Sequence, residues 1–157
     1  MNRRTLGFTL IEMMVVLSVV ALLASVAIPM AEIGVRRTKE ESLRTSLRQI
    51  RQAIDEFKAA ADQGRISLGS NQSGYPESLN SLVDGVEDKR SPTRAKMYFL
   101  RQLPRDPFAD VQLEASETWA LRSYESPPNA PKPGVDVYDI KSQSTEIGLN
   151  GKAYNTW

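Results

Sequence analysis

The chain has no cysteine and no histidine among its 157 residues. The lack of cysteine excludes disulfide bonds, thiolate metal sites and cysteine nucleophiles, although it does not fix the cellular compartment. The lack of histidine removes the side chain that most often acts as a general base or metal ligand. Most hydrolase and metalloenzyme mechanisms are therefore disfavoured, and we expect a protein that is not an enzyme.

An excess of charge of either sign is also missing. Lysine and arginine number 20 against 19 aspartates and glutamates, which gives a formal net charge of +1. A chain so balanced has no strong field to attract nucleic acid, so binding by phosphate neutralisation is not expected. The sequence contains no phosphate-binding glycine loop and no GxSxG motif. Its patterns are those of a structural protein.

An uncharged run covers residues 13–31, while the charged residues, 25% of the chain, all lie outside it. A helix over this run would span roughly 28 Å at about 1.5 Å per residue, close to the thickness of a bilayer's hydrocarbon core. The run could be a secretory signal cut after Ser25-Val26-Ala27, a plain membrane anchor, or an anchor with a short basic leader that is removed separately. Its length, and Glu12 at its beginning, argue against the secretory signal.

Glu12 lies among apolar residues at the start of this run. A carboxylate at the centre of a bilayer helix costs on the order of 2.5–3.5 kcal/mol, and a position near the helix end lowers that cost. Glu12 is therefore either an interfacial residue at the start of an anchor or a carboxylate that needs a cationic partner.

The sequence Gly7-Phe8-Thr9-Leu10-Ile11-Glu12, which follows a leader containing Arg3 and Arg4, resembles the prepilin leader of type IV pilins and type II secretion pseudopilins. The resemblance implies that a prepilin peptidase and N-methyltransferase of the membrane cuts between Gly7 and Phe8 and that the new N-terminal Phe8 is methylated. It also implies that Glu12 is the assembly residue of the family.

Charge pairing gives a physical reason for that role. Cleavage would place a positive amine on Phe8, and both this amine and the Glu12 carboxylate are costly in lipid unless they are paired. The two residues are four apart, so they can pair within one chain. Pairing with a neighbouring copy would instead fix the axial stagger of the packed helices. We therefore expect Glu12 to set the register of assembly.

Helical periodicity continues beyond the uncharged run. Pro29 lies within the pattern, where its ring and missing N–H favour a kink; the alternative is that it ends the helix. Apolar residues at steps of three and four predict an amphipathic helix over 36–61, with Gly64 as its stop. The apolar stripe consists of Leu43, Leu47, Ile50, Ile54, Phe57 and Ala61.

Charged residues on the other faces of this helix are spaced for ion pairs along its surface. Glu40–Arg44 and Arg51–Asp55 are examples at i, i+4 spacing. We expect these side chains to be solvated.

The C-terminal half predicts loops and short strands. Residues 75–83 indicate a short helix, and residues 85–93 indicate a mobile charged loop. Alternation of apolar and polar residues over 118–124 and 135–140 predicts two strands that pair antiparallel. The tail ends in Trp157, which we expect to pack as a cap. The predicted fold is α+β: a long N-terminal helix, with a transmembrane half and an amphipathic half, packed on a small antiparallel sheet with an irregular C-terminal loop region.

The second half extends the resemblance to the major, G-type pseudopilin of type II secretion systems. The matching residues are Gly74-Tyr75-Pro76, Leu79, Leu82, Leu103-Pro104-Arg105-Asp106-Pro107-Phe108 and Trp119. The resemblance implies a structural subunit of a pseudopilus, a periplasmic filament that pushes exoproteins through the outer-membrane secretin. The alternative is a type IV pilus (minor) pilin for adhesion, motility or DNA uptake; a membrane-tethered enzyme is disfavoured by the missing histidine and cysteine.

This reading divides the chain into a cleaved leader (1–7), a transmembrane and assembly half-helix (8–31) and a periplasmic head (32–157) that includes the half-helix 36–61. The resemblance implies a single-pass inner-membrane protein with a cytoplasmic N-terminus, which then enters the filament. The implied partners are copies of the chain, other pseudopilins, the prepilin peptidase and the inner-membrane assembly platform.

The resemblance also implies calcium in the C-terminal loop, although no cofactor is certain. The candidate ligands are Asp139, Ser142, Ser144 and Glu146. Residues 148–152 stand where the family has adjacent acidic residues. Calcium takes about six to eight oxygens, preferably several of them anionic, so two acids make a weak site at best. The alternative is that Trp157 and local hydrogen bonds hold this loop.

Overall fold

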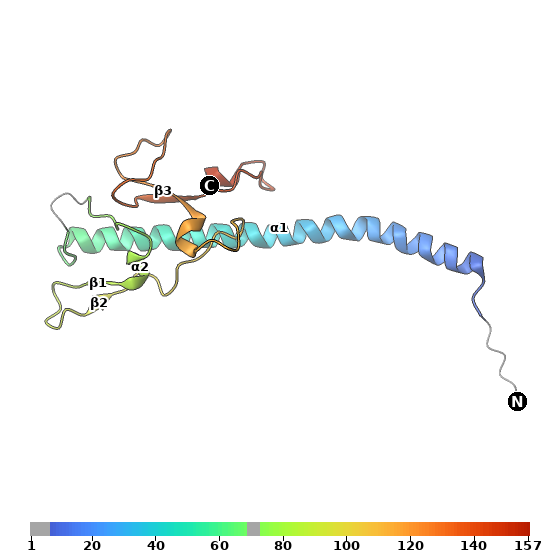
Figure 1. The fold of residues 1–157 in the computed structure, drawn as a ribbon, viewed down its shortest axis with the longest axis horizontal. Coiled ribbons are helices and arrows are strands. Elements are labelled where there is room, and N and C mark those ends of the chain that lie inside the picture. Colours follow the sequence, from blue (N-terminus) through green and yellow to red (C-terminus); the bar gives the residue numbers. More distant parts are fainter. Residues whose placement is uncertain (1–6, 69–72) are drawn as a thin grey trace, which may run out of the picture. The chain divides into compact units, whose positions relative to one another are not determined.

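The computed structural model describes residues 7–68 and 73–157 (Figure 1). Its elements in chain order are the helix α1 (Leu10–Asp62), the helix α2 (Ser81–Asp84), the strands β1 (Val86–Glu87) and β2 (Lys96–Met97), the 3₁₀ helix η1 (Ala115–Thr118), the strands β3 (Trp119–Arg122) and β4 (Asp139–Ser142), and the 3₁₀ helix η2 (Tyr154–Thr156). The chain divides into two units between Thr38 and Lys39, and α1 contributes residues to both.

The first unit contains the apolar part of α1. Every large hydrophobic side chain from Phe8 to Val35 is exposed. This part of the helix is long and apolar enough to cross a bilayer. A contiguous apolar surface of this extent marks a contact with membrane or with protein.

Proline does not interrupt the helix. α1 continues through Pro29, so the alternative that Pro29 ends the helix is wrong. The proline lacks the N–H that would donate to the carbonyl of residue 25, and a bend at this point stays a prediction.

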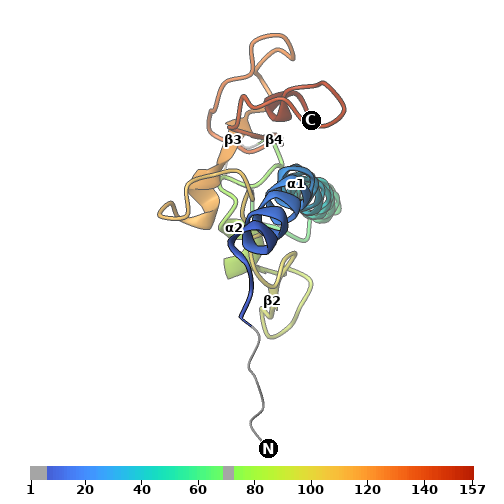
Figure 2. The ribbon, with the colours of Figure 1, turned by 90° about the vertical axis from the view of Figure 1, so that its right-hand side faces the viewer.

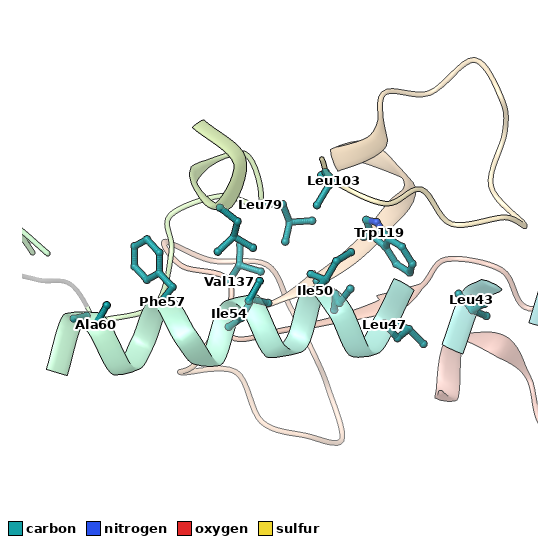
Figure 3. Close-up of a cluster of buried hydrophobic side chains, with 14 of the residues drawn as sticks. Leu43, Leu47, Ile50, Ile54, Phe57, Ala60, Leu79, Leu103, Trp119 and Val137 are labelled. Carbon is teal, nitrogen blue, oxygen red and sulfur yellow. The ribbon is translucent and has the colours of Figure 1, made fainter. Parts of the chain in front are cut away.

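The second unit is built on the amphipathic part of α1. All six residues of the predicted apolar stripe are buried, which confirms the periodicity. They form one hydrophobic cluster with Leu79, Leu103, Trp119 and Val137 (Figure 3). Leu79 lies just before α2, Trp119 is the first residue of β3, and Leu103 and Val137 lie in loops. The core therefore forms where one helix face meets the C-terminal half of the chain.

Glycine ends the helix as predicted. Gly64 has a φ of +70°, a left-handed conformation that glycine adopts at little cost. Its N–H donates to the carbonyl of Ala61 (2.8 Å), and Arg65 N donates to that of Ala60 (3.0 Å). These bonds satisfy carbonyl groups that the last turn leaves without helical partners.

Strands β3 and β4 pair antiparallel, with Trp119 opposite Ser142 and Leu121 opposite Ile140 (Figure 2). This pairing confirms the prediction, although β4 covers 139–142 where we expected 135–140. The difference arises because Val137 N donates to the carbonyl of Pro76 (2.8 Å), outside the sheet.

A second small sheet was not predicted. Strand β1 lies in the predicted mobile loop 85–93 and pairs antiparallel with β2, which follows that loop. Two-residue strands carry no alternating pattern, so periodicity could not reveal them. Asp88 follows β1 and is buried, where its carboxylate accepts hydrogen bonds from the Arg65 guanidinium and from Arg90 N (2.9 Å). The fold is α+β as predicted, with two small sheets instead of one.

The Asp88 contacts give stability that depends on pH. The hydrogen bond from Arg65, followed by that from Arg90 N, lowers the pKa of Asp88 below its ordinary value. A lowered pKa in the folded state adds stability above the ordinary pKa of about 4, and this stability is lost as the pH falls through the folded pKa. We expect Asp88→Asn to lower the Tm of the full chain in detergent at pH 7, and the difference from the parent to vanish with acidification towards pH 2. Glu87→Gln, at an exposed neighbour, should change the Tm little at either pH; a constant Asp88→Asn effect across the range would contradict this account.

The core residue Ile50 offers a test of the packing. Its side chain is fully buried in the cluster, so Ile50→Ala removes apolar contacts and leaves a cavity. We expect a loss of about 2–5 kcal/mol in the free energy of unfolding. Val111→Ala, at a residue that is 83% exposed, is the control and should change stability by no more than about 0.5 kcal/mol. Denaturant unfolding of the full chain followed by tryptophan fluorescence measures both, and equal effects would place Ile50 outside the core.

Candidate functional site

The N-terminal end of α1 is capped by Thr9 and Glu12. A Glu12 carboxylate oxygen, Oε2, accepts hydrogen bonds from Thr9 N (2.8 Å) and Thr9 Oγ1 (2.9 Å). In return, Glu12 N donates to Thr9 Oγ1 (3.2 Å). This reciprocal arrangement is a capping box, which satisfies backbone donors that the first turn leaves unpaired.

Thr9 is a residue of this site that the sequence interpretation missed. The Thr-x-x-Glu spacing is visible in the sequence and is the signature of a capping box. The two interpretations drawn from the sequence, an interfacial position and a pairing with a cation, do not include this role of Glu12. The structure gives its carboxylate a partner within its own chain, so an amine from a neighbouring copy would share or replace these bonds.

The surroundings of Glu12 are apolar. A hollow is lined by Glu12 together with the side chains of Phe8, Ile11, Val15 and Val16. Apart from the two hydrogen bonds from Thr9, these apolar groups offer the carboxylate no polar partner, so its negative charge can attract a cation. The pairing of Glu12 with an amine of a neighbouring copy stays a prediction.

The predicted cleavage point lies directly before this site. A side chain built at Gly7 would meet no atom within 4 Å, and Phe8 is 80% exposed. The peptide bond between them is thus open to a protease. Arg3 and Arg4 of the leader lie outside the described residues.

The predicted calcium ligands lie along β4 and the loop that follows it, and several of their oxygens already accept hydrogen bonds. Asp139 Oδ1 accepts from Arg51 Nε (2.8 Å) and from Ile140 N (2.8 Å). Ser142 Oγ accepts from Ser144 N (3.1 Å), and Ser144 Oγ accepts from Glu146 N (3.3 Å). The carbonyls of Ser144 and Glu146 accept from Asn155 N and Tyr154 N, both at 3.0 Å.

This donor set does not fit calcium. The Asp139 carboxylate is paired with the Arg51 guanidinium, so its charge is already neutralised. Among residues 7–68 and 73–157, no group of three or more acidic, histidine or cysteine side chains could hold a metal ion. A hard cation that prefers several anionic oxygens would also face the positive charge of Arg51.

The prediction that the charged side chains of the amphipathic helix are solvated and pair along its surface is wrong for Arg51 and Glu40. Arg51 pairs with Asp139 rather than with Asp55, its neighbour at i, i+4. Glu40 is buried and is not part of a solvated face. Both side chains are directed at the C-terminal part of the chain.

The N-terminal segment is similar to a known sequence family. Residues 2–28 match the family described as the prokaryotic N-terminal methylation motif. The match includes the predicted cleavage point, Thr9 and Glu12. The N-terminal segment of the chain is thus similar to this methylation motif.

A similar protein extends the comparison beyond the N-terminal segment. The chain is similar to the type II secretion system core protein G of Dickeya chrysanthemi, with 27% identity over 118 residues, which cover 72% of this chain and 70% of that protein. No solved structure shows significant similarity to the chain. Together, the motif and the relative confirm the predicted resemblance to pseudopilins of the G type.

Proposed function

We propose that this protein is a structural subunit of a type II secretion pseudopilus, a periplasmic filament that pushes exoproteins through the outer-membrane secretin. The observation that carries the proposal is the methylation motif over 2–28, placed at the start of a helix whose apolar side chains are exposed as far as Val35. A soluble protein rarely exposes so large an apolar surface, so membrane or neighbouring helices must cover it. The similarity to core protein G favours secretion over pilus functions.

Processing comes first in this proposal. The chain enters the inner membrane as a single-pass precursor with residues 1–7 in the cytoplasm, 8–31 in the bilayer and 32–157 in the periplasm. The prepilin peptidase cuts between Gly7 and Phe8 and the Phe8 amine is methylated. The mature chain then begins one residue before Thr9, the first member of the capping box.

Assembly then replaces lipid around the apolar helix with the same helix of other copies. Small residues on it, Ala21, Ala24, Ser25 and Ala27, permit close approach between helices. Among many apolar contacts that tolerate sliding, the pairing of one amine with one carboxylate selects a single stagger. Glu12 supplies that carboxylate from within its apolar hollow.

The role is mechanical, with no reaction at the subunit itself. The inner-membrane assembly platform and other pseudopilins are the partners, and the energy comes from another protein. Folded exoproteins are the cargo, and their identity is set elsewhere in the secretion system.

Deletion of the gene and complementation distinguish the two filament functions. We expect the deletion strain to retain exoproteins in the periplasm and the intact gene to restore their export, with a cytoplasmic and a periplasmic marker protein as controls for lysis. Normal export combined with lost adhesion, motility or DNA uptake would replace the proposal with the type IV pilus function. Fibres sheared from the complemented strain should contain this subunit with a methylated N-terminal Phe8, as measured by mass spectrometry.

A further inference from the structure

Glu40 is a buried carboxylate of α1 whose partners lie more than a hundred positions away in the sequence. Its side chain is 6% exposed, and Oε1 accepts hydrogen bonds from Leu149 N (2.7 Å) and from Tyr154 Oη (2.9 Å). A buried carboxylate is tolerated when such donors satisfy it. Glu40 therefore holds both the loop at 149 and the η2 helix.

Arg51 contacts the same part of the chain from three turns further along α1. Its Nε donates to Asp139 Oδ1 (2.8 Å), while Nη2 donates to the carbonyl of Ile140 (2.9 Å) and to that of Trp157 (3.0 Å). One guanidinium thus gathers a carboxylate and two carbonyl oxygens from β4 and from the last residue. Gathering anionic and carbonyl oxygens from separate segments is the structural task of a bound calcium ion in other proteins.

Aromatic contacts complete this attachment. The Tyr154 ring stacks on Phe108 with centroids 4.0 Å apart and meets Trp157 edge-on at 5.1 Å. The Arg44 guanidinium lies 4.6 Å from the Trp157 ring centroid. A side chain at Gly148 would come within 2.9 Å of both Trp157 and Tyr154, so glycine is required there for the close approach.

We propose that Glu40 and Arg51 form a clasp that fastens residues 139–157 to α1 in place of a metal ion. Arg51 supplies the positive charge that holds the oxygens of Asp139, Ile140 and Trp157 together. Glu40 supplies the acceptor for the hydrogen bonds from Leu149 N and Tyr154 Oη. Because the guanidinium is planar and covalently attached, it delivers three directed hydrogen bonds without any ion from solution. The head then keeps its C-terminal structure when divalent cations are removed.

The clasp does not depend on the proposed secretion role, because all of its contacts lie within the unit that begins at Lys39. The experiment therefore measures folding and not export. A failure of the clasp leaves the filament proposal intact, and a failure of export leaves the clasp intact.

The test uses hydrogen exchange of the purified full chain in detergent, read by mass spectrometry on peptides that cover 139–157. In the parent protein, we expect the exchange rates and the Tm to stay the same whether EDTA or excess calcium chloride is present. Slower exchange or a higher Tm with calcium would overturn the proposal.

Variants identify the side chains that carry the protection. We expect Arg51→Met and Glu40→Gln to speed exchange in this segment about tenfold or more, because charge-assisted hydrogen bonds are lost. Arg48→Met and Glu41→Gln, at exposed neighbours on the same helix, are the matched controls and should leave it unchanged. Equal rates in the clasp and control variants would overturn the proposal.

A conservative pair covers the case in which Arg51→Met does not fold. Arg51→Lys keeps the charge but loses the fork that reaches three oxygens, whereas Arg48→Lys alters only an exposed arginine. Faster exchange of residues 139–157 in Arg51→Lys alone supports the clasp, and the same rate in both variants contradicts it.

Discussion

Gly7→Val should leave the precursor uncut, so that residues 1–7 remain on nearly every copy. The physical reason is access, because a protease must bring its catalytic groups to the peptide bond between Gly7 and the bulky Phe8. A side chain at Gly7 would meet no atom of the protein within 4 Å, so the substitution does not disturb the fold. The defect must then arise in recognition by the peptidase.

Intact-mass measurement and N-terminal sequencing of the membrane fraction detect this outcome. The parent should begin at methylated Phe8, and Gly7→Val should begin at Met1. Gly34→Val is the matched control, because a side chain at Gly34 also meets no atom within 4 Å, and it should be cut normally. A mature chain that begins after Ala27 would support the secretory-signal interpretation instead and would remove the basis of the proposed function.

Glu12→Ala should leave cleavage intact and abolish filament assembly. The substitution removes the carboxylate that we expect to pair with the Phe8 amine of a neighbouring copy. Removing one partner of a charge pair that is buried between copies would leave the other charge without compensation, and in a filament this loss recurs at every subunit. Sheared-fibre yield, with total membrane-bound subunit as the reference, measures the effect; undiminished yield would remove the register argument.

Two further variants separate the charge of Glu12 from its role in the capping box. Glu12→Gln retains an oxygen that can accept from Thr9 but has no charge, so we expect it to assemble poorly. Thr9→Val removes the hydroxyl of the cap and should weaken the first turn by about 1 kcal/mol, with a smaller loss of fibres. If Glu12→Gln assembled normally while Thr9→Val did not, the cap rather than the charge would be the function of Glu12.

The sequence predicted those features that depend on neighbours along the chain. The uncharged run, the apolar stripe from Leu43 to Ala61 and the end of the helix near Gly64 all follow from local periodicity and backbone preference. The pairing of the last two strands was also predicted, because both carry alternation. The β1–β2 hairpin was not, since its strands are too short for any period to appear.

The C-terminal attachment could be decided only by the tertiary structure. In sequence, Glu40 and Arg51 look like members of surface ion pairs, because charged residues stand four positions from each. Their actual partners, Leu149, Tyr154, Asp139, Ile140 and Trp157, come from the far end of the chain.

The reason for this division lies in the range of the interactions. Helix formation, apolar patterning and the motif at the predicted cleavage point are properties of contiguous residues, so the sequence by itself determined an apolar N-terminal helix followed by an α+β head. Which charged side chains become buried depends on how the chain returns to α1 after a hundred residues of loops and strands. The residues next to an arginine or a glutamate in the sequence do not show whether its side chain faces water or forms hydrogen bonds with a distant part of the chain.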